Sequence, residues 1–314
     1  LPSDFPAKVL KEVERHWDEK QTLAAAEEGK RRDLRGLPMV TIDDDDAKDL
    51  DDAVSLEKTA DGFRLGVHIA DVSYYVEERS ALDREASRRA TSIYLPDRVI
   101  PMLPPQLSNG ICSLNPGSAR LAISVFMELT AAGELLNFDF CSSLISIDER
   151  LTYSAVNRLL QGERELEEKH AGFRQIITDM HLLADALKNR RKERGALGFN
   201  FPEAKIKLDE KGKPLDILVR RGGAAEEIIE EFMLLCNEVI ADYFYRKKVP
   251  FIYRVHERPA EDKLSVLRDF LSLFDIKLKG DPGKVTPRRL QDIIEKVKDT
   301  PLEKTINYVL LRSL

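Results

Sequence analysis

Seven of the ten residues from Asp43 to Asp52 are aspartates, and the run lies between two strand-like segments. Two unit charges 4 Å apart repel each other by about 4 kcal/mol at an effective dielectric constant near 20. A fold that brings several of these carboxylates together must therefore protonate them, separate them or neutralise them with a cation. The run thus has two interpretations, a solvated acidic loop or a cation-binding site.

The acidic loop is the commoner outcome for a run of aspartates, but the details of this run favour the cation site. Apolar residues flank it within 40–42 and 53–56, so both of its ends are anchored. Its spacing is irregular, and alternation within a strand places Asp49 and Asp51 on one face and Asp52 on the other. Oxygen ligands with no His or Cys nearby match a hard ion, Mg²⁺ or Mn²⁺.

The overall charge and the cysteines restrict the class of protein. The 314 residues include 49 Lys and Arg against 55 Asp and Glu, a net charge of −6. This balance excludes a uniformly basic nucleic-acid coat but not a local basic channel. The three cysteines are far apart and without CxxC spacing, so we expect free, buried thiols in a reducing compartment: Cys112, Cys141 and Cys236. No apolar run approaches 18 residues, so we expect no membrane span and a cytoplasmic protein.

The hydrophobic pattern changes along the chain, from strand-like in the first half to helical in the second half. This order predicts an α+β fold rather than alternating βαβ units. We expect an N-terminal helix and charged linker over residues 1–36 and one main domain over residues 37–314. The predicted elements are a helix at 5–25, strands within 37–76 with a hairpin turn at Asp61-Gly62, a helix at 81–91, an extended segment at 92–105, strands at 121–129 and 135–147, a helix at 173–195, a hairpin turning at 210–212, and helices at 224–245, 260–274, 287–298 and from 301 onward.

Several blocks of sequence, from TIDDDDAKDLDDAVS to FIYRVHERP, resemble the ribonuclease II/ribonuclease R family, also called the RNB family. The block TIDDDDAKDLDDAVS is similar to the family pattern of TID, a short gap and A-K/R-D-x-DDA. Further similar blocks follow in the expected order: GVHIADVSYYV, RVIPMLP, LSNGICSLNP, EEIIEEFMLLCNEVIADY and FIYRVHERP. RVIPMLP and LSNGICSLNP are closer to ribonuclease R than to ribonuclease II. The resemblance covers about residues 32–314 and implies an RNB nuclease domain, with a mixed, largely antiparallel β-sheet flanked by helices.

The resemblance implies a processive 3′→5′ exoribonuclease that hydrolyses RNA to nucleoside 5′-monophosphates. The family's catalytic carboxylates, which hold Mg²⁺ with Mn²⁺ as the alternative, match Asp43, Asp49, Asp51 and Asp52. By analogy, the loss of Asp51 is the least tolerated. Two ions about 4 Å apart then activate the attacking water and stabilise the leaving 3′ oxygen. Asp44 departs from the family, where a small residue or proline is common after TID, and this leaves the shape of the following turn open.

The same resemblance implies contacts with RNA. Tyr94 matches an aromatic residue that stacks on RNA, Phe199 matches one that clamps the terminal nucleotides, and Glu230 or Glu231 matches a carboxylate near the last ribose. The residues alone leave plainer alternatives open: both rings in the hydrophobic core and the carboxylates on an outer helix face. The expected partner is single-stranded RNA with its 3′ end in the active site, bound by a monomer without membrane contact.

Two histidines invite an acid–base interpretation that the sequence does not favour. His68 and Asp71 lie three residues apart at the end of a predicted strand, where a hydrogen-bonded structural role is the better interpretation. His256 stands between Arg254 and Arg258, which suit either phosphate oxygens or an ion pair with a neighbouring glutamate.

Segments that the resemblance leads us to expect are missing from the sequence. The chain opens without methionine and stops within an apparent helix. Cold-shock domains, an S1 domain and a stretch like HFTSPIRRYPD, whose arginines hold the scissile phosphate, do not occur in it. We expect a truncated nuclease domain with its C-terminal part missing, and little or no activity from the isolated piece.

Two other functions stay open. A catalytically silent RNA-binding or scaffold relative would share the fold, although such a protein need not keep four mutually repelling carboxylates. A Ca²⁺- or Mg²⁺-stabilised structural protein is the other alternative. An EF-hand loop starting at Asp43 does not support it, because Lys48 stands where that loop needs glycine and Val54 where it needs glutamate.

Overall fold

The computed structural model describes the chain except for residues 1–3, 19–26, 28, 200, 202, 221, 279 and 281–284, and the side chains of residues 16–18 and 220. The chain forms two compact units. The first is Leu1–Ala184 with Ala204–Val239, and the second is Asp185–Glu203 with Ile240–Leu314. The first unit contains the central sheet and the aspartate run, whereas the second is built from helices around a hydrophobic core of its own.

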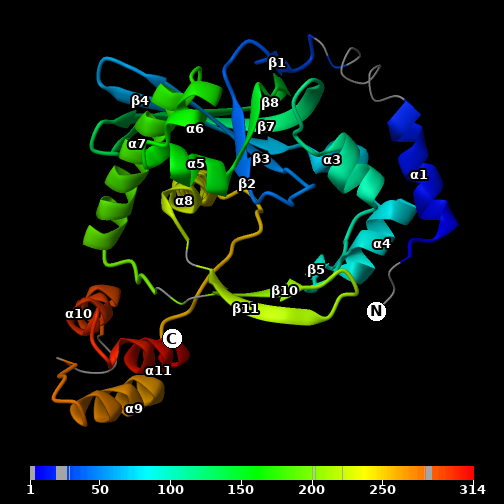
Figure 1. Cartoon of the computed structure of the whole chain (residues 1–314). Helices are drawn as coiled ribbons and strands as arrows, with labels where there is room; N and C mark the ends of the chain where they lie inside the picture. The colour runs from blue at the N-terminus through cyan, green and yellow to red at the C-terminus, as the bar shows by residue number, and fades with distance from the viewer. Residues whose placement is uncertain are drawn as a thin grey trace. The chain divides into compact units, whose positions relative to one another are not determined.

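One large sheet organises the first unit (Figure 1). Within the described residues it has seven strands in the order β1-β8-β7-β4-β3-β2-β9. Neighbouring strands are antiparallel except β1 with β8 and β2 with β9, which are parallel. The expected α+β fold with a mixed, largely antiparallel sheet is therefore confirmed. The strands are β1 (Arg32–Asp33), β2 (Val40–Asp43), β3 (Asp52–Lys58), β4 (Gly62–Ala70), β7 (Ala119–Thr130), β8 (Leu135–Ser146) and β9 (Glu149–Thr152).

Tight turns at predicted positions join the central strands. The hairpin between β3 and β4 turns at Asp61-Gly62, where the Thr59 amide donates to the Gly62 carbonyl over 2.9 Å. A side chain at Gly62 would meet the Leu129 carbonyl oxygen at 2.2 Å, so only glycine fits against β7. The β7–β8 hairpin also forms where expected, with Gly133 at φ 76°. The register of β3 with β4 follows from its turn, whereas a β-bulge between Glu128 and Leu129 shifts the register of β7 with β8 beyond its turn.

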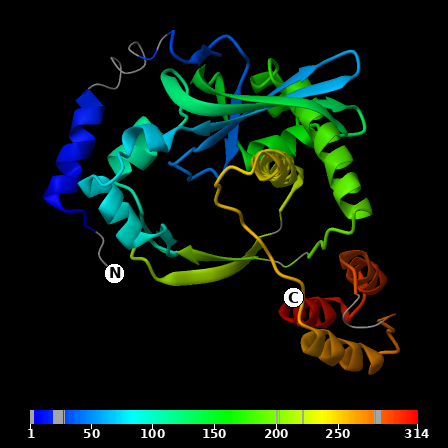
Figure 2. The same ribbon diagram turned by 180° about the vertical axis from the view of Figure 1, so that it is seen from behind.

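Helices cover the sheet of the first unit. In Figure 1, α5 and α6 lie in front of the strands and in Figure 2 behind them, so they cover one face. Helix α1 packs against α4, and its Glu12 carboxylate accepts hydrogen bonds from the amides of Ala81 and Leu82. Residues 19–25 of the predicted N-terminal helix lie outside the described part. Helices α7 and α8 continue into the second unit. The remaining elements are α1 (Ala7–Asp18), α3 (Val72–Tyr75), α4 (Ala81–Arg89), β5 (Ile93–Tyr94), β6 (Val99–Ile100), the π-helix η1 (Gln106–Ile111), α5 (Tyr153–Leu160), α6 (Arg164–Lys169), α7 (Arg174–Glu193), β10 (Glu203–Leu208), β11 (Pro214–Arg220) and α8 (Ala224–Lys247).

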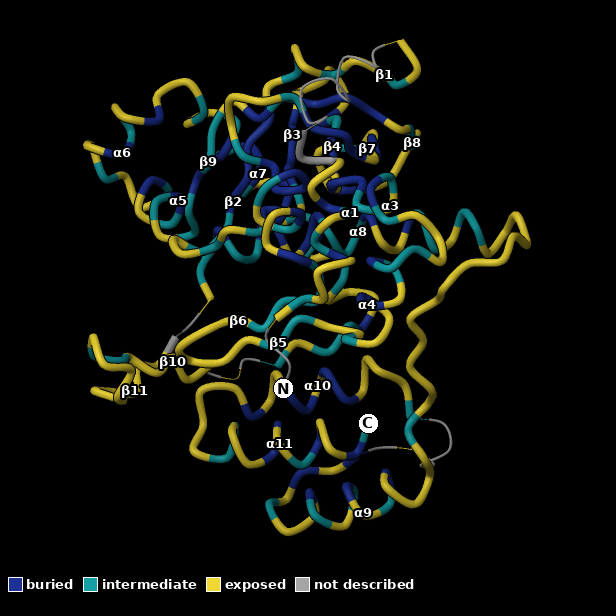
Figure 3. Tube along the Cα trace, turned by 90° about the vertical axis from the view of Figure 1, so that its right-hand side faces the viewer, coloured by how far each residue is buried: buried dark blue, intermediate teal, exposed yellow. Residues whose placement is uncertain are grey.

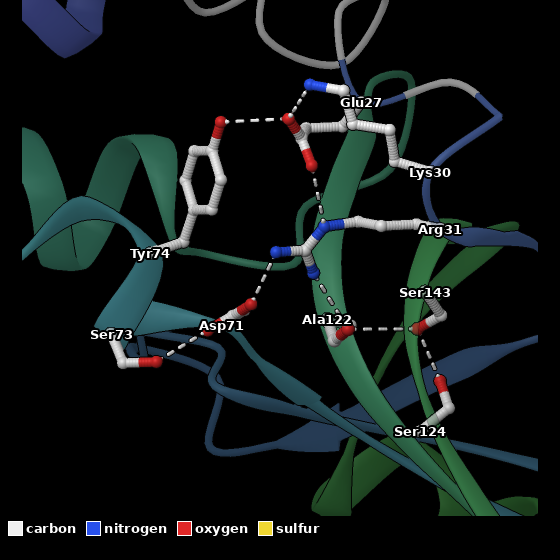
Figure 4. Close-up of polar contacts among 9 residues, drawn as sticks. All are labelled: Glu27, Lys30, Arg31, Asp71, Ser73, Tyr74, Ala122, Ser124 and Ser143. Atoms are coloured by element: carbon white, nitrogen blue, oxygen red, sulfur yellow. Dashed lines mark hydrogen bonds and ion pairs between the residues drawn. The ribbon is translucent and has the colours of Figure 1, made fainter.

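The charged segment before β2 is held on the sheet by polar contacts (Figure 4). The Arg31 guanidinium donates to the Asp71 carboxylate over 2.7 Å, and only 8% and 7% of the two side chains are exposed. Arg31 also donates to the Ala122 carbonyl at 3.4 Å, while the Tyr74 hydroxyl donates to Glu27 at 3.3 Å. Beside these contacts β1 pairs with β8, although the polar sequence predicts only a linker here.

The buried residues of the first unit lie along its sheet, and those of the second unit lie between three helices. Figure 3 shows buried residues along the central strands, whereas the β10–β11 hairpin is mostly exposed. In the second unit, α9 (Glu261–Ser272), α10 (Pro287–Val297) and α11 (Glu303–Ser313) enclose a core that includes Leu267 and Ile306. These three predicted helices are confirmed to within two residues at their ends.

All three cysteines are free, as predicted, and two of them, Cys112 and Cys236, are buried. Burial raises the pKa of the Cys236 thiol to about 11, so it stays protonated at neutral pH. None of the helices in the described part of the chain is long and apolar enough to cross a membrane.

His68 is fully buried in the sheet and belongs to a chain of hydrogen bonds across four strands. Its Nε2 lies 3.0 Å from Ser55 Oγ on β3 and its Nδ1 2.7 Å from Ser124 Oγ on β7. Ser143 on β8 donates to a main-chain carbonyl, so it accepts from Ser124, which in turn accepts from Nδ1. His68 is therefore neutral with its proton on Nδ1, and burial lowers its pKa to about 3. Its ring contacts serines and not Asp71, which confirms the structural interpretation.

Replacing His68 with glutamine tests this network through the pH dependence of stability. The unfolded histidine has a pKa near 6.5, whereas the folded one accepts no proton until about pH 3, so acid favours the unfolded chain. Below about pH 6.5 we expect the wild-type free energy of unfolding to fall faster than that of His68→Gln, by up to about 1.4 kcal/mol per pH unit. Urea unfolding between about pH 4 and pH 8 measures the difference. Parallel curves for the two proteins would contradict a buried neutral histidine.

Candidate active site

The aspartate run connects β2 with β3 at one end of this strand pair. Asp43 is the last residue of β2 and Asp52 the first of β3, and the two strands are antiparallel neighbours. The connecting loop, residues 44–51, is neither strand nor helix and carries Asp49 and Asp51. The apolar residues of both strands are buried, which anchors the two ends of the run as predicted. Local structure alone thus gathers the four carboxylates at one end of two paired strands.

Burial, together with the charges of neighbouring aspartates, raises the pKa of three of the four aspartates. Burial is the largest cause for Asp52, the charges of Asp51 and Asp43 add to it, and its pKa rises to about 7. Burial also raises the pKa of Asp43 and of Asp51, and the charge of Asp49 contributes to both shifts. Asp51 is accessible to solvent, yet enough protein surrounds it to disfavour its charge. The fold therefore concentrates negative charge at this point rather than dispersing it.

The donor chemistry of this cluster fits a hard divalent cation. All of its members are carboxylates. The attraction between these carboxylates and a bound cation would offset their mutual repulsion. Within the described residues, no three His, Cys, Asp or Glu side chains converge closely enough to form a finished ligand set. The aspartates nevertheless act on one another electrostatically, since their charges contribute to the pKa shifts of Asp43 and Asp52.

Hydrogen bonds from two neighbouring strands hold the backbone of the loop. Arg150 on β9 donates to the Ala47 carbonyl over 2.6 Å. The Ala70 amide at the end of β4 donates to the Asp51 carbonyl over 2.9 Å. Because residues 44–51 lie outside the strands, such contacts take the place of ladder hydrogen bonds and fix where the aspartates stand.

Tyr94 on β5 lies beside the aspartate run. Its hydroxyl donates to Asp49 Oδ2 over 3.2 Å, and partial burial together with the Asp49 charge raises the pKa of the tyrosine. The side chain is nevertheless 67% exposed, so the alternative of a core ring does not hold. An exposed aromatic face next to the carboxylates is free to stack on a base.

Sequence reasoning missed three residues around this site: Tyr153, Asn157 and Glu226. Tyr153 begins α5 directly after Thr152, which pairs with Asp43 in the parallel β2–β9 ladder. Burial and the charges of Asp43 and Asp52 raise the pKa of Tyr153, and the charge of Glu226 adds to the effect. The sequence holds no signal for Tyr153, because its position depends on a pairing between distant segments.

Asn157 connects α5 with the beginning of α8. Its Nδ2 donates to the Glu226 carboxylate over 2.9 Å, and its Oδ1 accepts from the Ala225 amide over 2.9 Å. A Cβ atom at Gly223 would lie 2.5 Å from Asn157 Oδ1, so the glycine leaves room for the Asn157 side chain in this position. The glycine pair at 222–223, directly before a predicted helix, was the signal available in the sequence.

The two glutamates predicted on α8 differ in their surroundings. Glu230 is exposed, whereas Glu231 is buried. Glu226, one helical turn before Glu230, is the carboxylate of this helix that acts on Tyr153. The predicted contact of Glu230 with a ribose stays a prediction.

Two further candidates belong to the second unit. Phe199 packs against the hydrophobic core of that unit and stacks on Phe201 with 5.7 Å between ring centroids. His256 is exposed, and its Nδ1 donates to the Glu257 carbonyl over 2.9 Å. The predicted clamping of RNA by Phe199 stays a prediction.

Comparison with known proteins relates the chain to one family. The RNB domain matches residues 31–314. Ribonuclease R 1 of Lactococcus lactis subsp. lactis (strain IL1403) is 44% identical over 315 residues, which cover 100% of this chain and 38% of that protein. Ribonuclease R of Thermotoga maritima is 43% identical over 319 residues, which cover 100% of this chain and 44% of that protein. The chain thus spans about two fifths of the length of these curated relatives.

Solved structures show the same relationship. Mycoplasma genitalium RNase R in complex with ribose-methylated single-stranded RNA matches with a TM-score of 0.86 and 32% identity, over 95% of this chain and 48% of that chain. Yeast Ssd1, described as a pseudonuclease, shares the fold with a TM-score of 0.73 but only 20% identity, over 92% of this chain and 35% of that chain. The match over residues 31–314 and the similarity to ribonucleases R agree with the resemblance in the sequence: the chain belongs to the RNB-domain family.

Proposed function

We propose that the protein containing this chain is a processive exoribonuclease that hydrolyses single-stranded RNA from the 3′ end to nucleoside 5′-monophosphates. One observation carries the proposal: a chain of the RNB family keeps four crowded aspartates, three of them with a raised pKa. Crowded carboxylates disfavour the folded state, and a phosphodiester-cleaving metal site explains their presence. The names of the relatives and the RNA bound to the Mycoplasma genitalium enzyme support the substrate.

In this proposal Asp43, Asp49, Asp51 and Asp52 hold two Mg²⁺ ions, or Mn²⁺ in their place. Divalent ions bound there supply electrostatic stabilisation of the phosphate and a water of lowered pKa. The backbone contacts from β4 and β9 keep the carboxylates in place while RNA binds. Tyr94 supports a base near the site by stacking, which ignores base identity and suits a nuclease without sequence preference.

The resemblance supports further assignments that belong to the same proposal. Residues 37–314 contribute to the catalytic domain, and residues 1–36 form the N-terminal helix and linker that precede it. Phe199 clamps the terminal nucleotides, and Glu230 contacts the last ribose. The protein acts as a monomer in the cytoplasm.

A catalytically silent RNA-binding relative is the second candidate, because Ssd1 is a pseudonuclease with this fold. Fold alone does not separate the two candidates. The charge of the aspartate cluster bears on the choice, because binding RNA through its phosphates requires positive rather than negative charge. Retention of all four carboxylates therefore favours the nuclease.

The length of a labelled RNA tests the proposed activity. We expect the complete gene product to shorten 5′-labelled single-stranded RNA from its 3′ end with Mg²⁺, to release 5′-monophosphates, and to do neither with EDTA. Asp51→Asn lowers the rate by about 100-fold or more, since loss of even an outer partner of a bound metal costs about 10- to 100-fold. Asp45→Asn, a change of an exposed aspartate in the same loop, is the control and keeps its activity. Binding without shortening by the wild type would favour the silent relative.

Asp52→Asn tests the electrostatic cost of the cluster in metal-free protein. The folded pKa of Asp52, about 7, lies above the ordinary 3.8, so this carboxyl destabilises the fold increasingly as the pH rises from about 4 to 7. We expect Asp52→Asn to raise the free energy of unfolding at about pH 8 by about 1–3 kcal/mol, allowing for solvent screening, and to have little effect at about pH 4. Urea unfolding in EDTA measures both values, with Asp45→Asn changing them by less than about 0.5 kcal/mol. An equal gain at both pH values would contradict the raised pKa.

Substitutions of Tyr94 separate its ring from its hydroxyl. Tyr94→Ala should weaken binding of single-stranded RNA by about 5- to 150-fold, which corresponds to about 1–3 kcal/mol for one stacked base. Tyr94→Phe keeps the ring and loses only the hydrogen bond to Asp49, so its affinity should stay within about 3-fold of the wild type. Fluorescence anisotropy in EDTA measures affinity without hydrolysis. Equal loss in both variants would show that the hydroxyl matters and the ring does not.

A further inference from the structure

The loop that carries Asp49 is clamped at both sides of that residue by one buried hydroxyl. Ser113 Oγ donates to the Lys48 carbonyl over 2.8 Å and accepts from the Leu50 amide over 3.1 Å. It also accepts from Asn115 Nδ2 over 2.8 Å. A serine hydroxyl has one proton and two lone pairs, so all of its hydrogen-bonding capacity is used.

Ser113 is itself fixed from two directions. Only 1% of it is exposed, and the next residue, Leu114, donates its amide to the Leu50 carbonyl over 2.7 Å. On the other side, the buried Arg120 on β7 donates from Nε to the Ser113 carbonyl over 2.8 Å. The same guanidinium donates to the carbonyls of Gly110 at 3.4 Å and Ala119 at 3.1 Å. A buried guanidinium that binds main-chain carbonyls holds the whole turn before β7 rigid.

The Ser113 hydrogen bonds restrain a loop whose negative charges repel one another. Residues 44–51 lie outside the strands, and the like charges of the aspartates among them repel one another. Fixing the peptide groups on either side of Asp49 limits the movement of this loop. The same restraint positions the Asp49 carboxylate, which accepts a hydrogen bond from the Tyr94 hydroxyl.

We infer that Ser113 is a positioning residue for Asp49: its hydroxyl holds the aspartate loop in the conformation that binds the divalent ion. The inference rests on the proposed function, because it takes Asp49 as a ligand. Ser113 lies in the block LSNGICSLNP and reaches the loop only through the fold. Partners behind metal ligands typically contribute about 10- to 100-fold to metal affinity.

Two measurements on the complete gene product test Ser113→Ala. Hydrogen exchange of the 44–51 segment should be about 3- to 10-fold faster in the variant, because the Leu50 amide loses its acceptor. The dissociation constant for Mn²⁺, measured by electron paramagnetic resonance with the metal alone, should rise about 10- to 100-fold, and so should the Mg²⁺ concentration for half-maximal RNA shortening. Ser113→Thr keeps a hydroxyl and should restore both values towards those of the wild type.

Ser124→Ala is the matched control, since Ser124 is an equally buried serine that bonds His68 instead of the loop. It should lower thermal stability as Ser113→Ala does and leave Mn²⁺ binding unchanged. Asn115→Ala removes only the donor that orients the hydroxyl, so it should give a smaller effect in the same direction, and it replaces Ser113→Ala if that variant does not fold. Wild-type affinity for Mn²⁺ in Ser113→Ala would overturn the inference alone. A wild type that binds no Mn²⁺ would overturn the proposed function, and the inference with it.

Discussion

Repulsion among the aspartates where β2 meets β3 is the constraint to which the surrounding structure responds. Carboxylates whose charges raise one another's pKa would move apart on an unsupported loop. Three kinds of contact oppose this movement: the buried strands at both ends, the Arg150 and Ala70 bonds to the loop backbone, and the Ser113 clamp around Asp49. The neighbourhood of the site is thus organised to keep like charges together.

Elsewhere in the same sheet, buried polar groups are arranged so that their cost is low. His68 is neutral and bonds two serines, and Arg31 pairs with Asp71 at a place where both are nearly buried. Within the described residues a few buried side-chain atoms lack a hydrogen-bond partner, among them Thr41 Oγ1 on β2, and the aspartates with raised pKa stand beside that strand. Such local conflicts are expected at functional sites.

Local patterns predicted most of the fold, because antiparallel neighbours joined by short turns carry their register in the turn residues. The β3–β4 hairpin at Asp61-Gly62 is the clear example, whereas a β-bulge between Glu128 and Leu129 changes the register of the β7–β8 hairpin beyond its turn. The parallel pairs could not be predicted in this way. Strand β1 is the polar pair Arg32–Asp33, which has no alternation to indicate a strand, and its pairing with β8 joins segments far apart in the chain.

The same distinction between local patterns and tertiary contacts holds for the residues of the candidate active site. The gathering of the four aspartates follows from their flanking strands, and Tyr94 was found through the resemblance. Tyr153 and Ser113 could not be found from the residues, since each reaches the aspartates through tertiary contacts: one through β9 and the other through the turn before β7.

The pairing of β2 with β9 has a consequence for biosynthesis. Asp43 and Thr152 are direct neighbours in the ladder although more than a hundred residues separate them. At about 5–20 residues per second, a ribosome needs roughly 5–20 s to synthesise the intervening chain. During that interval the newly made acidic segment lacks the parallel partner strand that completes its surroundings.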